Sequence, residues 1–138
     1  MSSSQSHLLI ELVTLHSKIQ KRLAGPLSCH GISLTDYLVL QQLAHAPDKR
    51  LRRVDLAQQV GLSASGVTRL LSPLQKIGLI SKEESARDAR VSLVTLTAAG
   101  ERIFRDALAT FDQTAQALLG SVSHEDQKTL LRITGSLL

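Results

Sequence analysis

Polar and cationic side chains gather in the middle of the chain, between Leu51 and Thr97. Ser65, Thr68 and Arg69 occur at a spacing that places them on one exposed face of a helix. Hydroxyl and guanidinium groups on such a face are the side chains with which a recognition helix reads base edges in the major groove of DNA. The chemistry that this segment predicts is therefore the binding of duplex DNA.

A second group of basic residues follows in a polar loop. Arg87 and Arg90 lie between an extended run at 78–83 and a run rich in β-branched residues at 91–96, and the two runs predict a hairpin. Guanidinium groups at the tip of a hairpin can reach phosphates or the narrow minor groove beside a recognition helix. A solvated turn is the alternative interpretation of this loop.

The distribution of charge favours a nucleic-acid partner. Residues 50–95 hold eight basic and four acidic side chains, a net charge of +4, whereas the rest of the chain holds eight of each. The whole formal charge of the protein thus lies in the segment that the polar motif indicates. A surface of this kind replaces the counterions of DNA phosphates.

Two helices joined by a short turn must position the polar face. Leu56, Ala57 and Val60 share one face of the first helix, and the small Ala57 allows the second helix to approach closely. Gly61 is expected to end the first helix, because the residue after a helix often needs a positive φ, which glycine adopts without steric cost. Ser63 is the predicted N-cap of the second helix.

Proline residues interrupt or end several predicted helices. Pro73 lies inside the second helix of the pair, where it removes the hydrogen bond to the Arg69 carbonyl and would cost about 3 kcal/mol in a straight helix. We therefore predict a bend at Pro73. A capped helix over 32–43, ended by Pro47, is expected to support the pair.

Apolar stripes occur at both ends of the chain. Segment 8–23 repeats leucine and isoleucine at helical spacing, and Gly25 and Pro26 are expected to end this helix. Thr97 is the predicted N-cap of a long helix that Gly120 ends. A terminal helix follows, and its start resembles a capping box with serine and aspartate three residues apart.

The three end helices carry more apolar surface than a small winged unit covers, which predicts a two-fold homodimer; a monomeric helical core is the alternative. We expect residues 1–32 and 98–138 to form a helical dimerisation region and residues 33–97 a winged helix-turn-helix. The predicted fold is mainly α with a small β-hairpin wing, in the order α-α-α-α-β-β-α-α. At 138 residues the chain can bury one core.

Neither an enzyme nor a metal or cofactor site is predicted. Residues 61–65 lack the last glycine of the G-x-S-x-G nucleophile elbow, and the five histidines form no i, i+4 pair enclosing a carboxylate. Cys29 with His30 would supply half of a metal site or a redox switch, but an inert lone thiol is the favoured interpretation.

The sequence favours a cytoplasmic protein. No apolar run approaches the roughly 18 residues that a membrane span requires, and the first residues lack the basic region of a secretory signal. A single cysteine cannot form an intramolecular disulfide, which is typical of a reducing compartment.

Three segments resemble the MarR family of transcriptional regulators. They are DLAQQVGLSASGVTRLL at 55–71, LQKIGLI at 74–80 and RDARVSLVTLTAAG at 87–100. The resemblance covers the winged helix-turn-helix closely and the flanking helices in outline. Its most specific part is the Asp-Ala-Arg triplet at 88–90 followed by Leu-Thr at 96–97.

The resemblance implies roles for the wing residues. In that family the aspartate and arginine that match Asp88 and Arg90 brace the wing, and an arginine at the tip enters the minor groove. That contact is implied for Arg87 or Arg90, and the resemblance does not decide between them. The predicted DNA-binding residues are Arg52, Arg53, Ser63, Ala64, Ser65, Thr68, Arg69, Arg87, Asp88 and Arg90.

The resemblance also implies a mode of action. A homodimer would bind a palindromic operator, most often as a repressor, with half-sites one helical turn or roughly 34 Å apart. Many members bind a small aromatic or anionic effector between the dimerisation helices and the winged unit, and the predicted lining here is His16, Cys29 and Tyr37. The alternative function is a helical protein–protein adaptor that keeps the winged fold without reading DNA.

Overall fold

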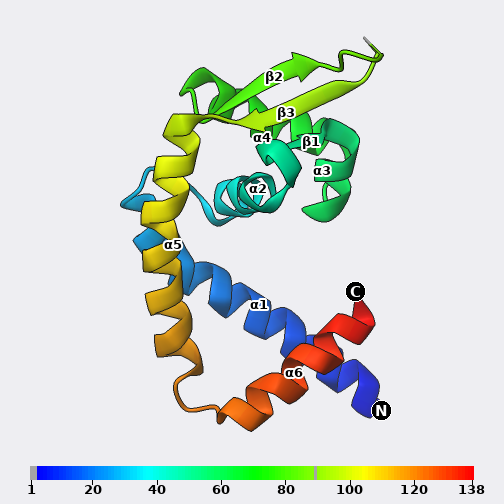
Figure 1. The fold of residues 1–138 in the computed structure, drawn as a ribbon. Helices are drawn as coiled ribbons and strands as arrows, with labels where there is room; N and C mark the ends of the chain where they lie inside the picture. Colours follow the sequence, from blue (N-terminus) through cyan, green and yellow to red (C-terminus); the bar gives the residue numbers. More distant parts are fainter. Residues whose placement is uncertain (1–2, 89) are drawn as a thin grey trace.

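The structure, a computed structural model, describes residues 3–88 and 90–138. Figure 1 shows the short helices and the sheet gathered at one end, with a long helix leading away from them. The mainly helical winged helix-turn-helix fold predicted from the sequence is confirmed. The elements are α1 (Ser4–Ser28), α2 (Leu34–His45), the 3₁₀ turn η1 (Pro47–Lys49), β1 (Arg50–Arg52), α3 (Arg53–Gln59), α4 (Ala64–Lys76), β2 (Ile80–Glu84), β3 (Ser92–Leu96), α5 (Ala98–Leu119) and α6 (His124–Leu137).

The wing sheet has one strand more than the predicted hairpin. Its order is β1-β3-β2, and both pairings are antiparallel. In β1, Leu51 lies opposite Val94, and Arg52 lies opposite Leu93. β1 is three residues long and too short for an alternating pattern to mark it. Its pairing holds the arginines at the start of α3 beside the wing.

One hydrophobic core joins these elements, and α2 lies at its centre. This helix contacts α1, α3, α4, α5, β1 and β3. Burial of such side chains contributes roughly 1.5–3 kcal/mol each. The largest fully buried side chains are Leu27 from α1, Val39, Leu40 and Leu43 from α2, Leu56 from α3, Val67, Leu71 and Leu74 from α4, and Ile80 and Val94 from the sheet.

The helix caps predicted from the sequence are present in the structure. Gly61 has a φ of +71°, and the Ser63 hydroxyl accepts a hydrogen bond from the backbone N–H of Gly66 at 3.1 Å. Thr97 caps α5 in the same way. Ser123 accepts from the Asp126 N–H, which is one half of the expected capping box. These bonds satisfy donors that a helix start leaves without partners.

The expected end of the first helix at Gly25 and Pro26 is wrong, because α1 continues to Ser28. Pro26 has no backbone N–H and so removes one hydrogen bond, but it lies close to the end of the helix, and the two residues after it remain helical. Continuation of the helix buries Leu27 completely. Packing of this leucine offsets the cost of the proline.

α4 is a single helix that includes Pro73. Pro73 lies in its last turn, and the Pro73 carbonyl accepts a hydrogen bond from the backbone N–H of Ile77 at 3.1 Å. The proline therefore does not end the helix, and a bend there stays a prediction.

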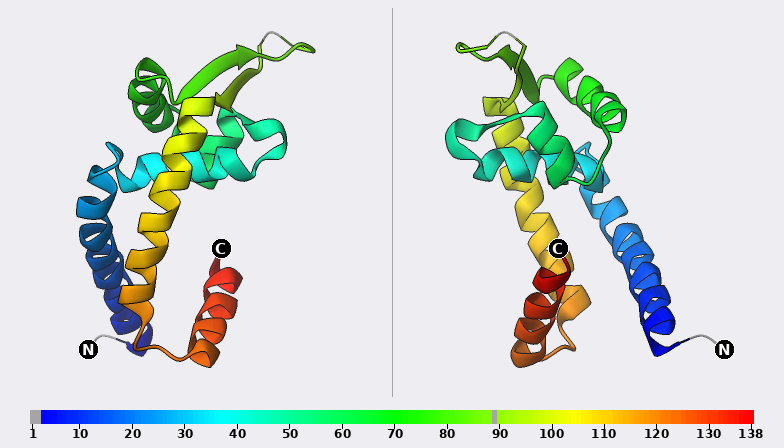
Figure 2. Two further views of the ribbon diagram at one scale, coloured as in Figure 1. Left: turned by 60° about the vertical axis from the view of Figure 1, so that its left-hand side comes forward. Right: turned by 90° about the vertical axis from the view of Figure 1, so that its right-hand side faces the viewer.

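The N-terminal half of α1 and the whole of α6 present apolar side chains to solvent. α6 crosses α1 in projection in Figure 1, but the right-hand view of Figure 2 separates them. No helix in the described part of the chain is long and apolar enough to cross a bilayer. Side chains that are 44–74% exposed include Leu8, Leu9, Ile10, Leu12, Val13 and Leu15 in α1, and Leu130, Leu131, Ile133 and Leu137 in α6.

Candidate nucleic-acid interface

α4 presents the polar face that its spacing predicts. Ser65, Thr68 and Arg69 are exposed, while Val67 and Leu71 on the opposite face are buried. The Thr68 hydroxyl donates to the Ala64 carbonyl at 2.9 Å, so its oxygen keeps lone pairs that face solvent. The exposed Ser63 and Ala64 adjoin this face at the helix start. The face offers one guanidinium and several small polar groups to a ligand outside the protein.

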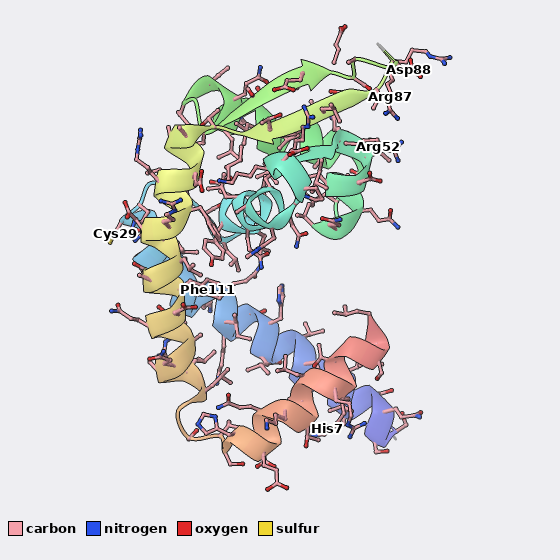
Figure 3. All side chains as sticks on the ribbon, viewed as in Figure 1. His7, Cys29, Arg52, Arg87, Asp88 and Phe111 are labelled. Atoms are coloured by element: carbon pink, nitrogen blue, oxygen red, sulfur yellow. The ribbon has the colours of Figure 1, made fainter. Side chains whose placement is uncertain are left out.

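The wing projects beyond the body of the molecule, and Figure 3 shows Arg87 and Asp88 near its tip. The Asp88 carboxylate accepts from Arg90 Nε at 3.1 Å and from Arg90 Nη2 at 3.3 Å, and the backbone N–H of Arg90 donates to it at 3.0 Å. These hydrogen bonds join the two residues to which the resemblance assigns bracing of the wing. No ion pair within residues 3–88 and 90–138 involves Arg87.

The bracing pair predicts a pH response of the wing. Hydrogen bonds from the Arg90 side chain and then from its backbone lower the pKa of Asp88 below 3.8. Because the folded pKa is the lower one, the pair stabilises the wing above about pH 4, and this stabilisation is lost as the pH falls through the folded pKa. We expect the Asp88 carboxyl carbon to titrate below 3.8 by NMR. A midpoint at or above 3.8 would show that the pair does not form in solution.

A second ion pair fixes the entrance to α3. Arg52 donates from Nε to Asp55 Oδ2 at 3.0 Å and from Nη2 to Asp55 Oδ1 at 3.2 Å. The side-chain hydrogen bond lowers the pKa of Asp55 and raises that of Arg52. The Arg52 side chain is still 52% exposed, so the pair orients it without removing it from the surface. Arg53, the first residue of α3, is half-buried.

A groove of about 700 Å³ lies between α3, the start of α4 and the loop end of the wing at residues 90–92. Ala57, Val67 and Val91 contribute to its apolar lining. Figure 3 shows Arg52 at the same end of the molecule as Arg87 and Asp88. The groove is also lined by Arg52, Arg53 and Arg90. Their positive charges suit an anionic chain that passes between the helices and the wing.

Sequence reasoning missed Val54 in this surface. Val54 occupies the second position of α3, its side chain is 62% exposed, and it lines the groove. A valine carries no charge signal, so only its place beside the groove distinguishes it from an ordinary surface residue. An apolar side chain here could contact a sugar or a thymine methyl group.

The predicted effector residues lie in different surroundings. Tyr37 is 3% exposed, and its ring stacks on Phe111 with centroids 4.6 Å apart and planes 6° apart. Burial, and then the charge of Asp112, raises the pKa of Tyr37. His16 and Cys29 are exposed on α1 and at its end. Figure 3 places Cys29 at the surface beside α5.

The sequence analysis did not foresee the aromatic neighbours of Tyr37. Phe104 lies 5.5 Å from the Tyr37 ring, so two phenylalanines from α5 surround the tyrosine. His30 Nε2 lies 2.7 Å from Thr110 Oγ1 and joins the end of α1 to the same helix. In the part of the chain that the structure describes, no three His, Cys, Asp or Glu side chains meet as a metal site requires.

Comparison with known proteins agrees with this architecture. The sequence model described as "MarR family" matches residues 30–91. The HTH-type transcriptional regulator PrsX of Escherichia coli is 24% identical over 97% of this chain and 81% of its own length.

Solved structures share this fold at similarly low sequence identity. Sco3205 of Streptomyces coelicolor, a MarR family transcriptional regulator solved in complex with DNA, superposes with a TM-score of 0.89 at 22% identity, over 99% of this chain and 88% of that one. NadR, solved in complex with 4-hydroxyphenylacetate, superposes with a TM-score of 0.84 at 22% identity, over 99% and 96% of the two chains.

The matched residues include the whole of α2, α3 and α4 and the wing up to Val91. Of these elements, α3, the start of α4 and the wing border the groove. The family consists of transcriptional regulators and not of enzymes. The chain therefore has the winged helix-turn-helix fold of MarR family transcriptional regulators, and its residues 30–91 match the sequence model of that family.

Proposed function

We propose that this protein is a sequence-specific DNA-binding repressor that acts as a homodimer on a palindromic operator. The observation that carries the proposal is the groove on which α3, α4 and the wing converge, with three arginines along it. Its neighbours are the polar face of α4 and the braced wing. The complex of Sco3205 with DNA supports the same use of this fold.

Each part of this surface would have its own task. Ser65, Thr68 and Arg69 would contact base edges in the major groove, with Ser63 and Ala64 close to the backbone at the start of α4. Arg87 would enter the minor groove, because Asp88 holds the guanidinium of Arg90 at the base of the loop. Arg52, Arg53 and Arg90 would then contact phosphates along the groove.

The homodimer would be built from residues 1–32 and 98–138. Exposed leucine, isoleucine and valine side chains on α1 and α6 form apolar surfaces that a soluble monomer rarely presents. A two-fold partner that covers them would also place two copies of α4 on one duplex. The two half-sites would lie one helical turn apart. Because the two-fold axis relates them, the operator would be a palindrome.

A small effector is the proposed means of release from DNA. NadR is known in complex with 4-hydroxyphenylacetate, an aromatic anion. We propose that the corresponding site involves His16, Cys29 and Tyr37, next to the aromatic cluster that Tyr37 forms with two rings of α5. A ligand that binds the non-DNA geometry better by about 1–3 kcal/mol would shift the dimer away from DNA.

Selection of bound duplexes from a random pool tests the proposal. We expect an enriched palindrome, and an affinity that drops about a thousandfold between 50 and 200 mM salt, since three arginines from each protomer give six phosphate contacts. Equal affinity for selected and random duplexes would contradict sequence-specific binding. Failure to bind any duplex at low salt would favour the adaptor alternative.

Two substitutions separate base reading in the major groove from the sequence-independent contact that the wing makes in the minor groove. Arg69→Ala is expected to reduce discrimination between matched and mismatched duplexes by about 1–3 kcal/mol, because a guanidinium that reads bases is lost. Arg87→Ala is expected to weaken binding to all duplexes and to make the salt slope shallower by about one per arginine removed. Titrations of both variants against matched and mismatched duplexes measure the difference. The same loss of discrimination in both variants would contradict the division of tasks.

A further inference from the structure

The first turn of α5 is joined by an ion pair to the turn that precedes β1. Glu101 Oε1 accepts from Lys49 Nζ and from Arg105 Nη2, the latter at 2.9 Å. The Glu101 side chain is 26% exposed, so solvent screens the pair only in part. The hydrogen bond from Lys49 lowers the pKa of Glu101. The pair connects segments that are 52 residues apart.

Lys49 belongs to a turn with an unfavourable backbone. Asp48 and Lys49 have φ values of +56° and +55°, in the left-handed region that residues with a Cβ rarely adopt. Such residues persist where neighbouring groups hold them. Here Glu101 holds Lys49, and Arg50 bridges Asp48 at 3.9 Å and Glu83 at 3.4 Å. The turn is therefore held both from α5 and from β2.

This turn leads directly into the candidate DNA surface. β1 begins at Arg50, the residue after Lys49, and it ends at Arg52, directly before α3 begins at Arg53. A change of backbone angle at Lys49 therefore moves the arginines at the entrance to α3. The turn influences the groove although it does not line it.

The same first turn of α5 is also fixed on its other side. The Thr97 hydroxyl donates to the Gly78 carbonyl at 2.6 Å, and the Thr97 backbone N–H donates to the Leu79 carbonyl at 3.1 Å. α5 thus has a defined position against the end of α4. Because the start of α5 is fixed in this way, Glu101 can hold the turn before β1 in one position.

We propose that Glu101 is a positioning residue for DNA binding, which acts through Lys49 to hold β1 and the arginines at the entrance to α3 in their DNA-binding geometry. The inference rests on the proposed function, because it concerns an affinity for duplex DNA. Glu101 acts without contacting DNA itself.

The direction in which DNA affinity changes when the Glu101 charge is removed separates this role from an effect of net charge. Glu101→Gln makes the protein more positive, and a change in net charge alone would strengthen binding to a polyanion. Loss of the positioning contact would instead weaken binding to DNA. Asp106→Asn is the matched control, because Asp106 is an exposed acid on the same helix and its removal changes the net charge equally.

The experiment is a set of titrations against the selected duplex, at a temperature where circular dichroism shows each variant folded. We expect Glu101→Gln to bind about five- to tenfold more weakly than the wild type, and Asp106→Asn to bind equally or more tightly. The affinity loss in the double variant Lys49→Gln/Glu101→Gln should be no larger than that in the weaker-binding single variant, because all three variants lack the same Lys49–Glu101 pair. Hydrogen exchange should accelerate over residues 50–59 in Glu101→Gln and remain unchanged in α6.

Several outcomes would overturn the inference. One is binding of Glu101→Gln as tight as that of the wild type, and another is weaker binding with unchanged exchange over 50–59. Additive losses in the double variant would mean that Lys49 contacts DNA directly. If Glu101→Gln does not fold, Lys49→Gln reports on the same pair through the same exchange measurement. Absence of wild-type binding to any duplex would refute the proposed function as well, whereas the other results leave it standing.

Discussion

Replacement of Gly100 by alanine is expected to destabilise the protein by about 3 kcal/mol. A Cβ atom on Gly100 would lie 2.1 Å from the Leu79 carbonyl oxygen and 2.7 Å from Leu96 Cδ1. The Leu79 oxygen is backbone, and it also accepts a hydrogen bond from the Thr97 N–H, so it cannot move away alone. α5 would have to shift away from the turn between α4 and β2, which disturbs the core and the wing together.

A thermal melt followed by circular dichroism measures this effect. We expect the Tm of Gly100→Ala to fall by roughly 10 °C for a chain of this length. Gly25→Ala is the matched control, because Gly25 also lies within a helix and a Cβ there meets nothing within 4 Å. The control should be as stable as the wild type or slightly more stable, since alanine favours helix by up to about 1 kcal/mol. Equal melting temperatures of the two variants would contradict the close approach of α5 to Leu79.

The second large effect is expected from charges placed on the apolar face of α6. Leu130, Ile133 and Leu137 follow one another at helical spacing, and their side chains are 44–74% exposed. In a dimer that buries this face, Leu130→Glu/Ile133→Glu would leave carboxylates without partners in an apolar interface. We expect the variant to be monomeric and to bind the palindrome at least about a hundredfold more weakly, because the two half-sites are no longer bound by one particle.

Light scattering after gel filtration, together with DNA titration, tests this prediction. Lys128→Gln/Arg132→Gln is the control, since these residues lie on the opposite face of α6 and the change in net charge is the same. The control should remain a dimer. A dimeric Leu130→Glu/Ile133→Glu variant with wild-type affinity would show that α6 lies outside the dimer interface.

The sequence predicted the elements that local chemistry specifies. Gly61 and Ser63 mark the turn between α3 and α4 because each supplies something that few residues offer there: a positive φ and a capping oxygen. The exposed face of α4 followed from spacing alone. Arg87 and Arg90 were placed in the wing because β-branched residues and a polar loop surround them.

Features that depend on distant contacts could not be predicted in this way. β1 forms because β3 is available for pairing, and three residues carry no pattern of their own. α1 extends past Pro26 because the core receives Leu27. The stacking of Tyr37 on Phe111 and the pair of Lys49 with Glu101 join segments far apart in the chain, and no spacing rule connects them.

The sequence also carries a signal for the start of α3. Arg52 and Asp55 are three residues apart, a spacing at which opposite charges can pair at the start of a helix. Recognition of that pair would have placed the beginning of α3 at Arg53 and oriented Arg52. The strained turn at Asp48 and Lys49, in contrast, has no such signal, because neither residue type requires a positive φ.

Chemical footprinting of the wild-type protein on its selected duplex tests the central claim most directly, namely that a dimer reads DNA with α4 and the wing. The account predicts two protected patches in the major groove, about one helical turn or roughly 34 Å apart, each flanked by protection in the minor groove that Arg87→Ala removes. A single continuous patch, or minor-groove protection that persists in Arg87→Ala, would contradict it.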